Sequence, residues 1–263
     1  MARNSLKNVM KLIDTAKQTV LPEDGFLNDL KRSIEMTDEK YARKPSQTYK
    51  PSSMNCIRQS FYQIVGADPD PANSSYISVG ICNSGSDIHV RIQTAILDMK
   101  ENGMDCEYVP VDEFVRLRGL KDINIVGVSG METKLYHKKF NMSFMCDGII
   151  KYKNHYYILE LKTENSNKFF NRNSVDYNHY HQATAYSLAF GIDEVLFVYI
   201  SRDTLDMKSF LLNVTPAMKE ELVGYIEECD SYVKKLIAPP KPENISKKAC
   251  SYCGYKEQCK KDN

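Results

Sequence analysis

The chain has 263 residues, of which 42% are hydrophobic and 26% are charged, and its net charge is +1. Such a chain can bury a substantial core, as one large domain or as one domain with a small appendage, so intrinsic disorder is excluded. The near-neutral charge gives no bulk attraction to a polyanion, and no G-x-x-x-x-G-K-[ST] loop of an ATP-driven motor occurs. No apolar run reaches the length of a membrane span and the first residues lack a secretory signal, so we expect a cytoplasmic protein.

The predicted elements alternate between helices and strands. An amphipathic helix is expected over 4–19, followed by polar, proline-punctuated sequence from Pro22 to Ser53 with room for one helix. Ser53 is expected to cap a short helix that ends near Gly66, and 77–99 has helical spacing. Further along we expect strands around 107–115 and 123–152, a helix over 177–190, a strand over 193–200, an edge strand over 208–214 and a helix from its cap Thr215 to Leu236.

This order predicts an α/β fold in which helices flank a central mixed β-sheet. We divide the chain into an N-terminal helical and loop extension (1–52), a core (53–237), and a linker with a cysteine-rich tail (238–263). The linker is stiff because three of its first five residues are proline.

A pair of carboxylates is predicted to meet across a β-hairpin. Two mostly buried strands flank Lys153-Asn154, a polar pair suited to a two-residue turn. Facing residues would then have numbers that sum to 307, so Asp147 would face Glu160, with Cβ atoms about 4.5–5.5 Å apart. Lys162 would share that face. Two carboxylates so close in apolar surroundings repel each other unless a cation lies between them, which predicts a divalent-metal site with a lysine beside it.

The Glu-x-Lys pattern alone is common. A second copy, Glu132-Thr133-Lys134, lies in a polar alternating stretch for which we predict a solvated surface strand. The copy at Glu160 differs because its neighbours are apolar, and we interpret 143–150 as one continuous, mostly buried strand opposite it.

One histidine lies on the inward face of the helix predicted over 77–99. Gly85, His89, Ile92 and Ile96 follow one another at i, i+4, i+7 and i+11, which places them on one stripe. Taken alone, such a histidine is most often a core residue.

The last cysteines have the spacing of a metal or cluster site. Cys250, Cys253 and Cys259 form C-x₂-C-x₅-C, and no histidine follows His181 to complete the set. The fourth ligand must be distant, and Cys56 is the best candidate because it opens a helix outside the buried strands; the alternative is a small core residue. The spacing leaves structural zinc and an iron–sulfur cluster both open.

Together these elements resemble the PD-(D/E)-x-K nuclease superfamily, in its RecB-like branch. The similarity is closest to the four-cysteine exonucleases, which include CRISPR-associated single-domain nucleases, the AddB nuclease domain and many phage proteins. Cys146 stands where the family name has proline, and nothing resembles the helicase portions of larger relatives. The matching residues are His89, Asp147, Glu160-Leu161-Lys162, the Q-x-x-x-Y residues Gln182 and Tyr186, and the four cysteines from Cys56 to Cys259.

The resemblance implies a restriction-endonuclease-like core and phosphodiester hydrolysis in DNA. It implies Mg²⁺ or Mn²⁺ held by His89, Asp147, Glu160 and the backbone carbonyl of Leu161. Lys162 would orient or activate the attacking water, or offset charge on the phosphate.

The resemblance also assigns roles around this centre. Gln182 and Tyr186, one helical turn apart, would position DNA or the active-site lysine. The four cysteines would hold a [4Fe-4S] cluster that joins Cys56 to the tail, with zinc as the runner-up. Two further features stay open: Lys168, Phe169, Phe170 and Arg172 either contact single-stranded DNA or pack on their own domain, and His179 and His181 are either surface residues or minor DNA contacts.

The expected function is therefore that of a metal-dependent exonuclease on single-stranded or end-bearing DNA, acting in recombination, replication or repair and of a kind that phages encode. A structure-specific endonuclease or a CRISPR spacer-processing nuclease is the alternative within the same chemistry. A zinc-stabilised nucleic-acid-binding protein without catalysis is the alternative of another class, against which the intact Asp147, Glu160 and Lys162 argue. DNA is the expected partner, and a homo-oligomer and a helicase or recombination partner are left open.

Overall fold

The computed structural model describes residues 21–40, 46–70, 75–243, 245 and 247–262. The helix expected over 4–19 lies outside the described residues. Of the described residues, 21–40 and 75–82 belong to one compact unit, and 46–70 and 83–262 belong to a second. Among them, no helix combines the length and the apolar character needed to cross a bilayer.

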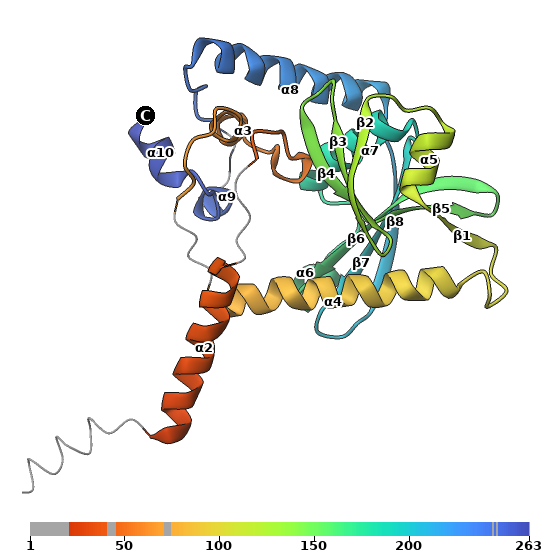
Figure 1. The fold of residues 1–263 in the computed structure, drawn as a ribbon, viewed down its shortest axis with the longest axis horizontal. Helices are drawn as coiled ribbons and strands as arrows, with labels where there is room; N and C mark the ends of the chain where they lie inside the picture. The colour runs from red at the N-terminus through yellow and green to blue at the C-terminus, as the bar shows by residue number, and fades with distance from the viewer. Residues whose placement is uncertain (1–20, 41–45, 71–74, 244, 246, 263) are drawn as a thin grey trace, which may run out of the picture. The chain divides into compact units, whose positions relative to one another are not determined.

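The first unit contains α2 (Pro22–Lys40) and the start of α4 (Tyr76–Asp98) (Figure 1). The one helix allowed for in the polar sequence from Pro22 to Ser53 is α2, which has 19 residues. Pro22 begins the helix and Glu23 and Asp24 follow in its first turn, where proline and negative charge both favour a helix N-terminus. Within this unit the carboxylate of Glu35 accepts a hydrogen bond from the backbone N–H of Tyr76 at 2.9 Å.

The second unit is built on two sheets, and the predicted α/β fold with a mixed central sheet is confirmed. Three of the four neighbouring strand pairs of the large sheet are antiparallel, whereas β6 and β7 pair in parallel. The expected edge strand near 208–214 is indeed the last strand of this sheet. The large sheet has the order β1 (Cys106–Val109), β5 (Gly148–Tyr152), β6 (His155–Glu164), β7 (Glu194–Ser201) and β8 (Met207–Asn213), and the small one is β2 (Ile123–Ser129), β3 (Glu132–His137) and β4 (Met142–Cys146).

Helices flank these sheets. Thr215 caps α8 as predicted, because its side chain accepts from the backbone N–H of Met218, and the helix ends at the left-handed residue Leu236. Ser53 caps no helix; it ends a short 3₁₀ helix, and Cys56 occupies the N-cap position of the next helix. The helical elements of this unit, besides α4, are η1 (Pro51–Ser53), α3 (Ile57–Ile64), α5 (Val111–Leu117), α6 (Ser166–Phe170), η2 (Tyr177–His179), α7 (Tyr180–Phe190), α8 (Pro216–Lys235), α9 (Lys247–Ser251) and α10 (Lys256–Lys261).

The expected strand over 107–115 is wrong in its second half. The strand ends at Val109, and α5 follows with Pro110 at its N-cap. The buried residues of this helix are Val111, Phe114 and Val115, which is helical spacing and not the alternation of a strand.

The continuous strand expected over 143–150 is also wrong, because it breaks at Asp147. Strand β4 ends at Cys146 in the small sheet, and β5 begins at Gly148 in the large one. Gly148 has a φ of +156°, a conformation that side chains with a Cβ rarely adopt, and a Cβ there would lie 3.1 Å from the Met131 side chain. The break places Asp147 at the junction of the two sheets.

The hairpin register itself is confirmed. Gly148 pairs with Leu159 and Tyr152 pairs with His155, so facing residues have numbers that sum to 307. Lys153 and Asn154 form the turn with φ values of +48° and +64°, as a type I′ turn requires.

The core lies on both faces of the large sheet. On one face, residues of β6 and β7 pack against α7, α8 and α3, with Ile158, Phe197 and Tyr186 among the fully buried residues. On the other face, Leu159 and Leu161 pack with Ile88 of α4. Alternation along β6 therefore turns Glu160 and Lys162 toward α7.

Candidate functional site

Asp147 is held at the beginning of the hairpin by the backbone of the facing strand. Its Oδ2 accepts a hydrogen bond from the N–H of Leu161 at 2.7 Å, and its backbone carbonyl accepts one from Gln93 Nε2 at 3.2 Å. Asp147 is only 6% exposed and Glu160 only 3%. The backbone of Leu161, a predicted metal ligand through its carbonyl, thus lies directly beside the Asp147 carboxylate.

A hydrogen-bonded network joins Glu160, Lys162, Gln182 and Tyr186. Lys162 Nζ lies 2.6 Å from Glu160 Oε1 and donates to Gln182 Oε1 at 2.8 Å. Gln182 Nε2 donates to Glu160 Oε1 at 2.8 Å and to the Tyr186 hydroxyl at 2.6 Å. Tyr186 in turn donates to the carbonyl of Met145. The amide of Gln182 turns its oxygen to the ammonium and its nitrogen to the carboxylate, which is the orientation that satisfies both.

His89 approaches the site from α4. Its Nδ1 is 3.5 Å from Asp147 Oδ1, and its side chain is 27% exposed. Burial disfavours the imidazolium, but the hydrogen bond and the charge of Asp147 outweigh it and raise the pKa of His89. Gln93, one helical turn further along α4, contacts the same aspartate; its i+4 position after His89 is a signal that the sequence contained and that we did not use.

One oxygen of the buried Glu160 carboxylate has no hydrogen-bond partner among the described residues. Burial, with the nearby Asp147 charge, raises its pKa to about 7 although Lys162 lowers it. Its Oε2 is buried and has no hydrogen-bond partner within the described part of the chain. No three His, Cys, Asp or Glu side chains of the described residues are grouped closely enough to coordinate an ion as they stand.

A buried aromatic stack lies beside the site along β7. In the parallel pairing, Phe197 lies beside Glu160 and Tyr199 beside Lys162. The ring of His179 stacks with both, at centroid distances of 6.0 Å and 5.9 Å and interplanar angles of 12° and 24°.

The two histidines before Gln182, for which a surface position and a minor DNA contact were left open, are both half-buried. His179 Nδ1 is 2.9 Å from the Tyr199 hydroxyl, and His181 Nδ1 is 2.7 Å from the carbonyl of Met54. Each of them therefore links the start of α7 to another segment of the unit.

Four side chains after β6 were expected either to contact DNA or to pack on their own domain, and two of them pack while two are exposed. Phe169 is 2% exposed and Arg172 9%, so both pack within their own domain. Arg172 forms ion pairs with Glu164 and Asp176 and lies 4.1 Å from the centre of the Tyr199 ring. Phe170 is exposed, and Lys168 pairs with Asp176 at 2.9 Å, so only these two of the four side chains are accessible to a ligand.

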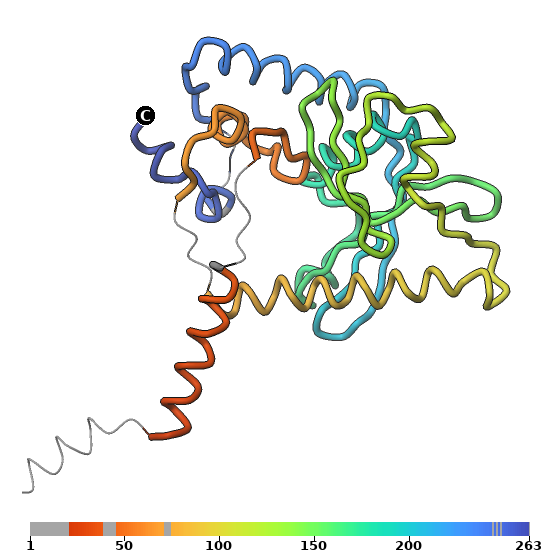
Figure 2. The backbone as a smooth tube through the Cα atoms, viewed as in Figure 1, coloured from red at the N-terminus to blue at the C-terminus, as the bar shows by residue number. Residues whose placement is uncertain are grey.

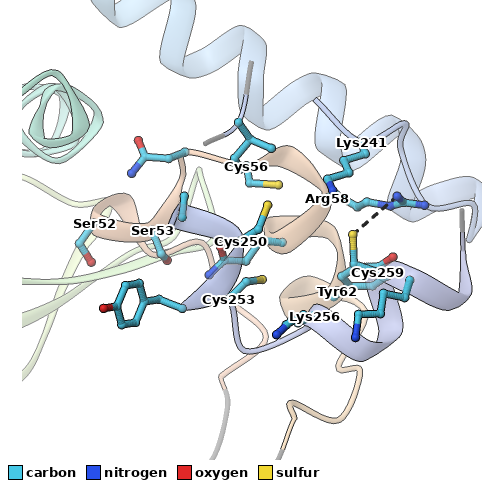
Figure 3. Close-up of a pocket in the computed structure, with 16 residues that line it drawn as sticks. Ser52, Ser53, Cys56, Arg58, Tyr62, Lys241, Cys250, Cys253, Lys256 and Cys259 are labelled. Atoms are coloured by element: carbon cyan, nitrogen blue, oxygen red, sulfur yellow. Dashed lines mark hydrogen bonds between the residues drawn. The ribbon is translucent and has the colours of Figure 1, made fainter. Parts of the chain in front are cut away.

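The four cysteines singled out in the sequence line one cavity of about 420 Å³. They come from separate segments: Cys56 precedes α3, Cys250 lies in α9, Cys253 follows it and Cys259 lies in α10 (Figure 3). Burial raises the pKa of the Cys56 and Cys253 thiols, and the charges of the neighbouring cysteines add to this effect. The remaining lining residues are Ser52, Ser53, Asn55, Arg58, Gln59, Tyr62, Lys241, Ile245, Ala249, Tyr252, Lys256 and Lys260.

Hydrogen bonds made by two cavity-lining residues of α3 attach the tail to this helix, and the trace in Figure 2 shows the two segments side by side. Arg58 donates to the carbonyl of Asp262 at 2.6 Å and to Cys259 Sγ at 3.7 Å. The Tyr62 hydroxyl donates to the Asp262 carboxylate at 2.7 Å. The tail thus returns across roughly two hundred residues of sequence to the helix that Cys56 begins.

The other four cysteines lie elsewhere. Cys106, Cys146 and Cys229 are buried and pack in the core, whereas Cys82 is exposed.

No protein-family model matches the sequence, and no curated protein matches it. Among solved structures, that of SSO0001 is similar with a TM-score of 0.45 and 16% identity, over 89% of this chain and 95% of that one. The alkaline exonuclease LHK-Exo from Laribacter hongkongensis is similar with a TM-score of 0.36 and 9% identity, over 73% of this chain and 92% of its own. LHK-Exo in complex with dAMP gives a TM-score of 0.37 and 10% identity over 72% and 91%. Scores this low carry no functional assignment, so function has to be argued from the geometry of the site.

Proposed function

We propose that the chain is a metal-dependent deoxyribonuclease that hydrolyses phosphodiester bonds at single-stranded or end-bearing DNA. The observation that carries the proposal is the buried Glu160, whose Oε2 has no partner among the described residues while Asp147 lies across the hairpin. A buried carboxylate oxygen without a partner is costly, and a cation is the group that offsets a pair of carboxylates.

The donor set fits a hard divalent ion. His89, Asp147, Glu160 and the backbone carbonyl of Leu161 would hold Mg²⁺ or Mn²⁺, since three of the four donors are oxygens and one imidazole is compatible with manganese. Such an ion would polarise the scissile phosphate and lower the pKa of water so that hydroxide is present near neutral pH.

Lys162 is the residue that faces both the site and the solvent. Its ammonium lies 2.6 Å from Glu160 and its side chain is 22% exposed, so it is accessible to a phosphate. It would orient the attacking water or offset the charge that develops on the phosphate. Gln182 and Tyr186 act through it, because the Gln182 amide bridges the lysine, Glu160 and the tyrosine hydroxyl.

The cysteine cavity is proposed to hold a [4Fe-4S] cluster bound by Cys56, Cys250, Cys253 and Cys259. The proposal is supported by the four cysteines lining one cavity of about 420 Å³ and by the C-x₂-C-x₅-C spacing of the tail with one distant cysteine, and zinc is the runner-up for this site. The role proposed for the cluster is structural, as a clamp between α3 and the tail.

The proposed setting is DNA recombination, replication or repair, with DNA as the partner.

The test is cleavage of end-labelled linear DNA, single- and double-stranded, and of circular single-stranded DNA, with Mg²⁺ or Mn²⁺. We expect linear DNA to be degraded from its ends, circular DNA to persist, and Asp147→Ala to abolish cleavage. Cutting of the circle would instead favour the endonuclease alternative, and unchanged activity of Asp147→Ala would defeat the proposal. Iron and zinc contents measured on the same protein decide the nature of the cysteine site.

A further inference from the structure

His179 lies in the site without a role in the network described above. It is the last residue of η2 and the N-cap of α7, three residues before Gln182. Its ring stacks with Phe197 and Tyr199, which are the strand neighbours of Glu160 and Lys162. The imidazole therefore lies on the same face of the sheet as the carboxylate and the lysine, one strand away.

The hydrogen bonds around Tyr199 determine which nitrogen of His179 carries the proton. The backbone N–H of Asp176 donates to the Tyr199 hydroxyl oxygen at 3.1 Å. The only acceptor for the hydroxyl proton among the described residues is His179 Nδ1, at 2.9 Å. Burial raises the pKa of Tyr199 to about 12, so the hydroxyl keeps its proton. His179 Nδ1 is thus an acceptor, and Nε2 carries the hydrogen.

The His179 imidazole is neutral at physiological pH, so the hydrogen stays on Nε2 and Nδ1 stays an acceptor. Burial disfavours its charged form, and the nearby Lys162 ammonium adds to the effect, so that the pKa of His179 falls to about 3. Lys168 and Arg172 act in the same direction, and Asp176 opposes them.

The Nε2–H donor has no hydrogen-bond partner within the described part of the chain. A half-buried donor beside a cationic lysine is suited to an anion, and charge-assisted hydrogen bonds of an N–H to a phosphate oxygen are among the stronger ones. Stacking against two fixed rings keeps the donor in place before a ligand arrives, which lowers the entropy that binding would lose.

We propose that His179 is a DNA-binding residue whose Nε2–H donates to a non-bridging oxygen of a substrate-strand phosphate next to the scissile one. The inference rests on the proposed deoxyribonuclease function and adds a residue to its substrate contacts. Its effect falls on DNA affinity and KM, because a phosphate one step from the reaction is held equally before and during bond cleavage.

The test distinguishes the effect of the Nε2–H donor from the effect of the stacked ring. His179→Phe keeps a ring on Phe197 and Tyr199 but removes the donor, whereas His179→Gln keeps an N–H near the Nε2 position. Affinity is measured by fluorescence anisotropy with a labelled single-stranded oligonucleotide, in an Asp147→Asn background that does not cut it. Cleavage kinetics are measured with Asp147 intact, and circular dichroism checks folding.

We expect His179→Phe to weaken DNA binding and raise KM about tenfold with kcat nearly unchanged, since a hydrogen bond to a charged group is lost. We expect the DNA affinity and KM of His179→Gln to stay within about threefold of those of the parent.

Equal affinity of His179→Phe and its parent would overturn the inference, as would a loss confined to kcat. If His179→Phe does not fold, His179→Ala takes its place, and equal weakening in His179→Ala and His179→Gln overturns it too. A parent that binds DNA but does not cut it would instead count against the proposed function.

Discussion

The hairpin site and the cysteine cavity are held together in opposite ways. In the site, Lys162, Gln182 and Tyr186 fill the space around Glu160 with direct hydrogen bonds between protein groups. In the cavity, the protein contacts lie at the periphery, as between Tyr62 and Asp262, and about 420 Å³ in the middle is lined but not filled by side chains. Direct hydrogen bonds between protein groups therefore set the geometry of the first region, whereas the second is a cavity at which we proposed a cluster.

The difference predicts which property each region controls. A single substitution in the dense network changes the reaction more than it changes the fold, because many other contacts remain. A substitution in the cavity is expected to act on stability, because the cluster proposed to bind there would add contacts that the protein alone does not make.

The largest effect is expected for Lys162→Ala. We expect cleavage of linear DNA to slow by about 10²–10³-fold, because the only ammonium in contact with Glu160 among the described residues is removed. The matched control is Lys134→Ala, in the second Glu-x-Lys copy, where the side chain is exposed on β3. Initial rates under saturating Mg²⁺ measure both variants. Equal losses would mean that the two copies do not differ and that the site is misassigned.

The next effect concerns the cavity. Cys250→Ser is expected to lose bound iron and its visible absorption, and to lower the free energy of unfolding by about 3 kcal/mol through loss of a group bound only by the folded state. Urea unfolding and iron analysis are the measurements. Cys82→Ser, which changes an exposed cysteine that is not among the residues lining the cavity, should keep both the iron content and the stability. Full iron content in Cys250→Ser would remove this residue from the proposed cluster.

A smaller change is expected for Tyr186→Phe. The ring contact with Phe144 is kept, but the hydroxyl no longer accepts from Gln182 or donates to the Met145 carbonyl. The free energy of unfolding should fall by about 1–2 kcal/mol, because buried groups lose partners. Tyr177→Phe, at an exposed tyrosine, is the control and should leave the urea midpoint unchanged. A stability loss below the error of the control would show that this hydroxyl is not needed by the network.

A pH dependence of the free energy of unfolding is expected to come from His179. Its folded-state pKa of about 3 lies below the ordinary value of 6.5, so the unfolded chain binds more protons between these pH values. Stability contributed by the neutral imidazole is thus present above pH about 6.5 and lost as pH falls toward 3, by up to about 1.4 kcal/mol per pH unit. Urea unfolding at pH 7 and pH 5 should show a smaller difference in His179→Phe than in the wild type. Equal differences would contradict burial of this group.

The sequence predicted the parts of the site that depend on local periodicity. The turn at Lys153-Asn154 and the alternation of β6 suffice to derive the register that brings Asp147 toward Glu160, and this register is observed. The helical stripe through His89 likewise places it on the face of α4 that approaches Asp147. Both results follow because strand pairing and helix pitch are repeated, short-range geometries.

Residues whose surroundings come from distant segments could not be predicted in this way. The sequence alone shows Arg172 and His179 as a cation and an imidazole in a polar stretch, although one pairs with Glu164 and the other stacks on β7. The strand break at Asp147 is also tertiary, since it occurs where the chain passes from one sheet to another.

The sequence by itself therefore determined the order of the elements, the hairpin register and the set of four cysteines with unusual spacing. Only the tertiary structure decided that Glu160 Oε2 is buried and lacks a partner within the described residues, and that the four cysteines line one cavity. It also brought His179 alongside Lys162 through the pairing of β6 with β7. The physical reason is that burial and long-range proximity depend on how separate elements pack, and no local pattern encodes the packing partner of an element.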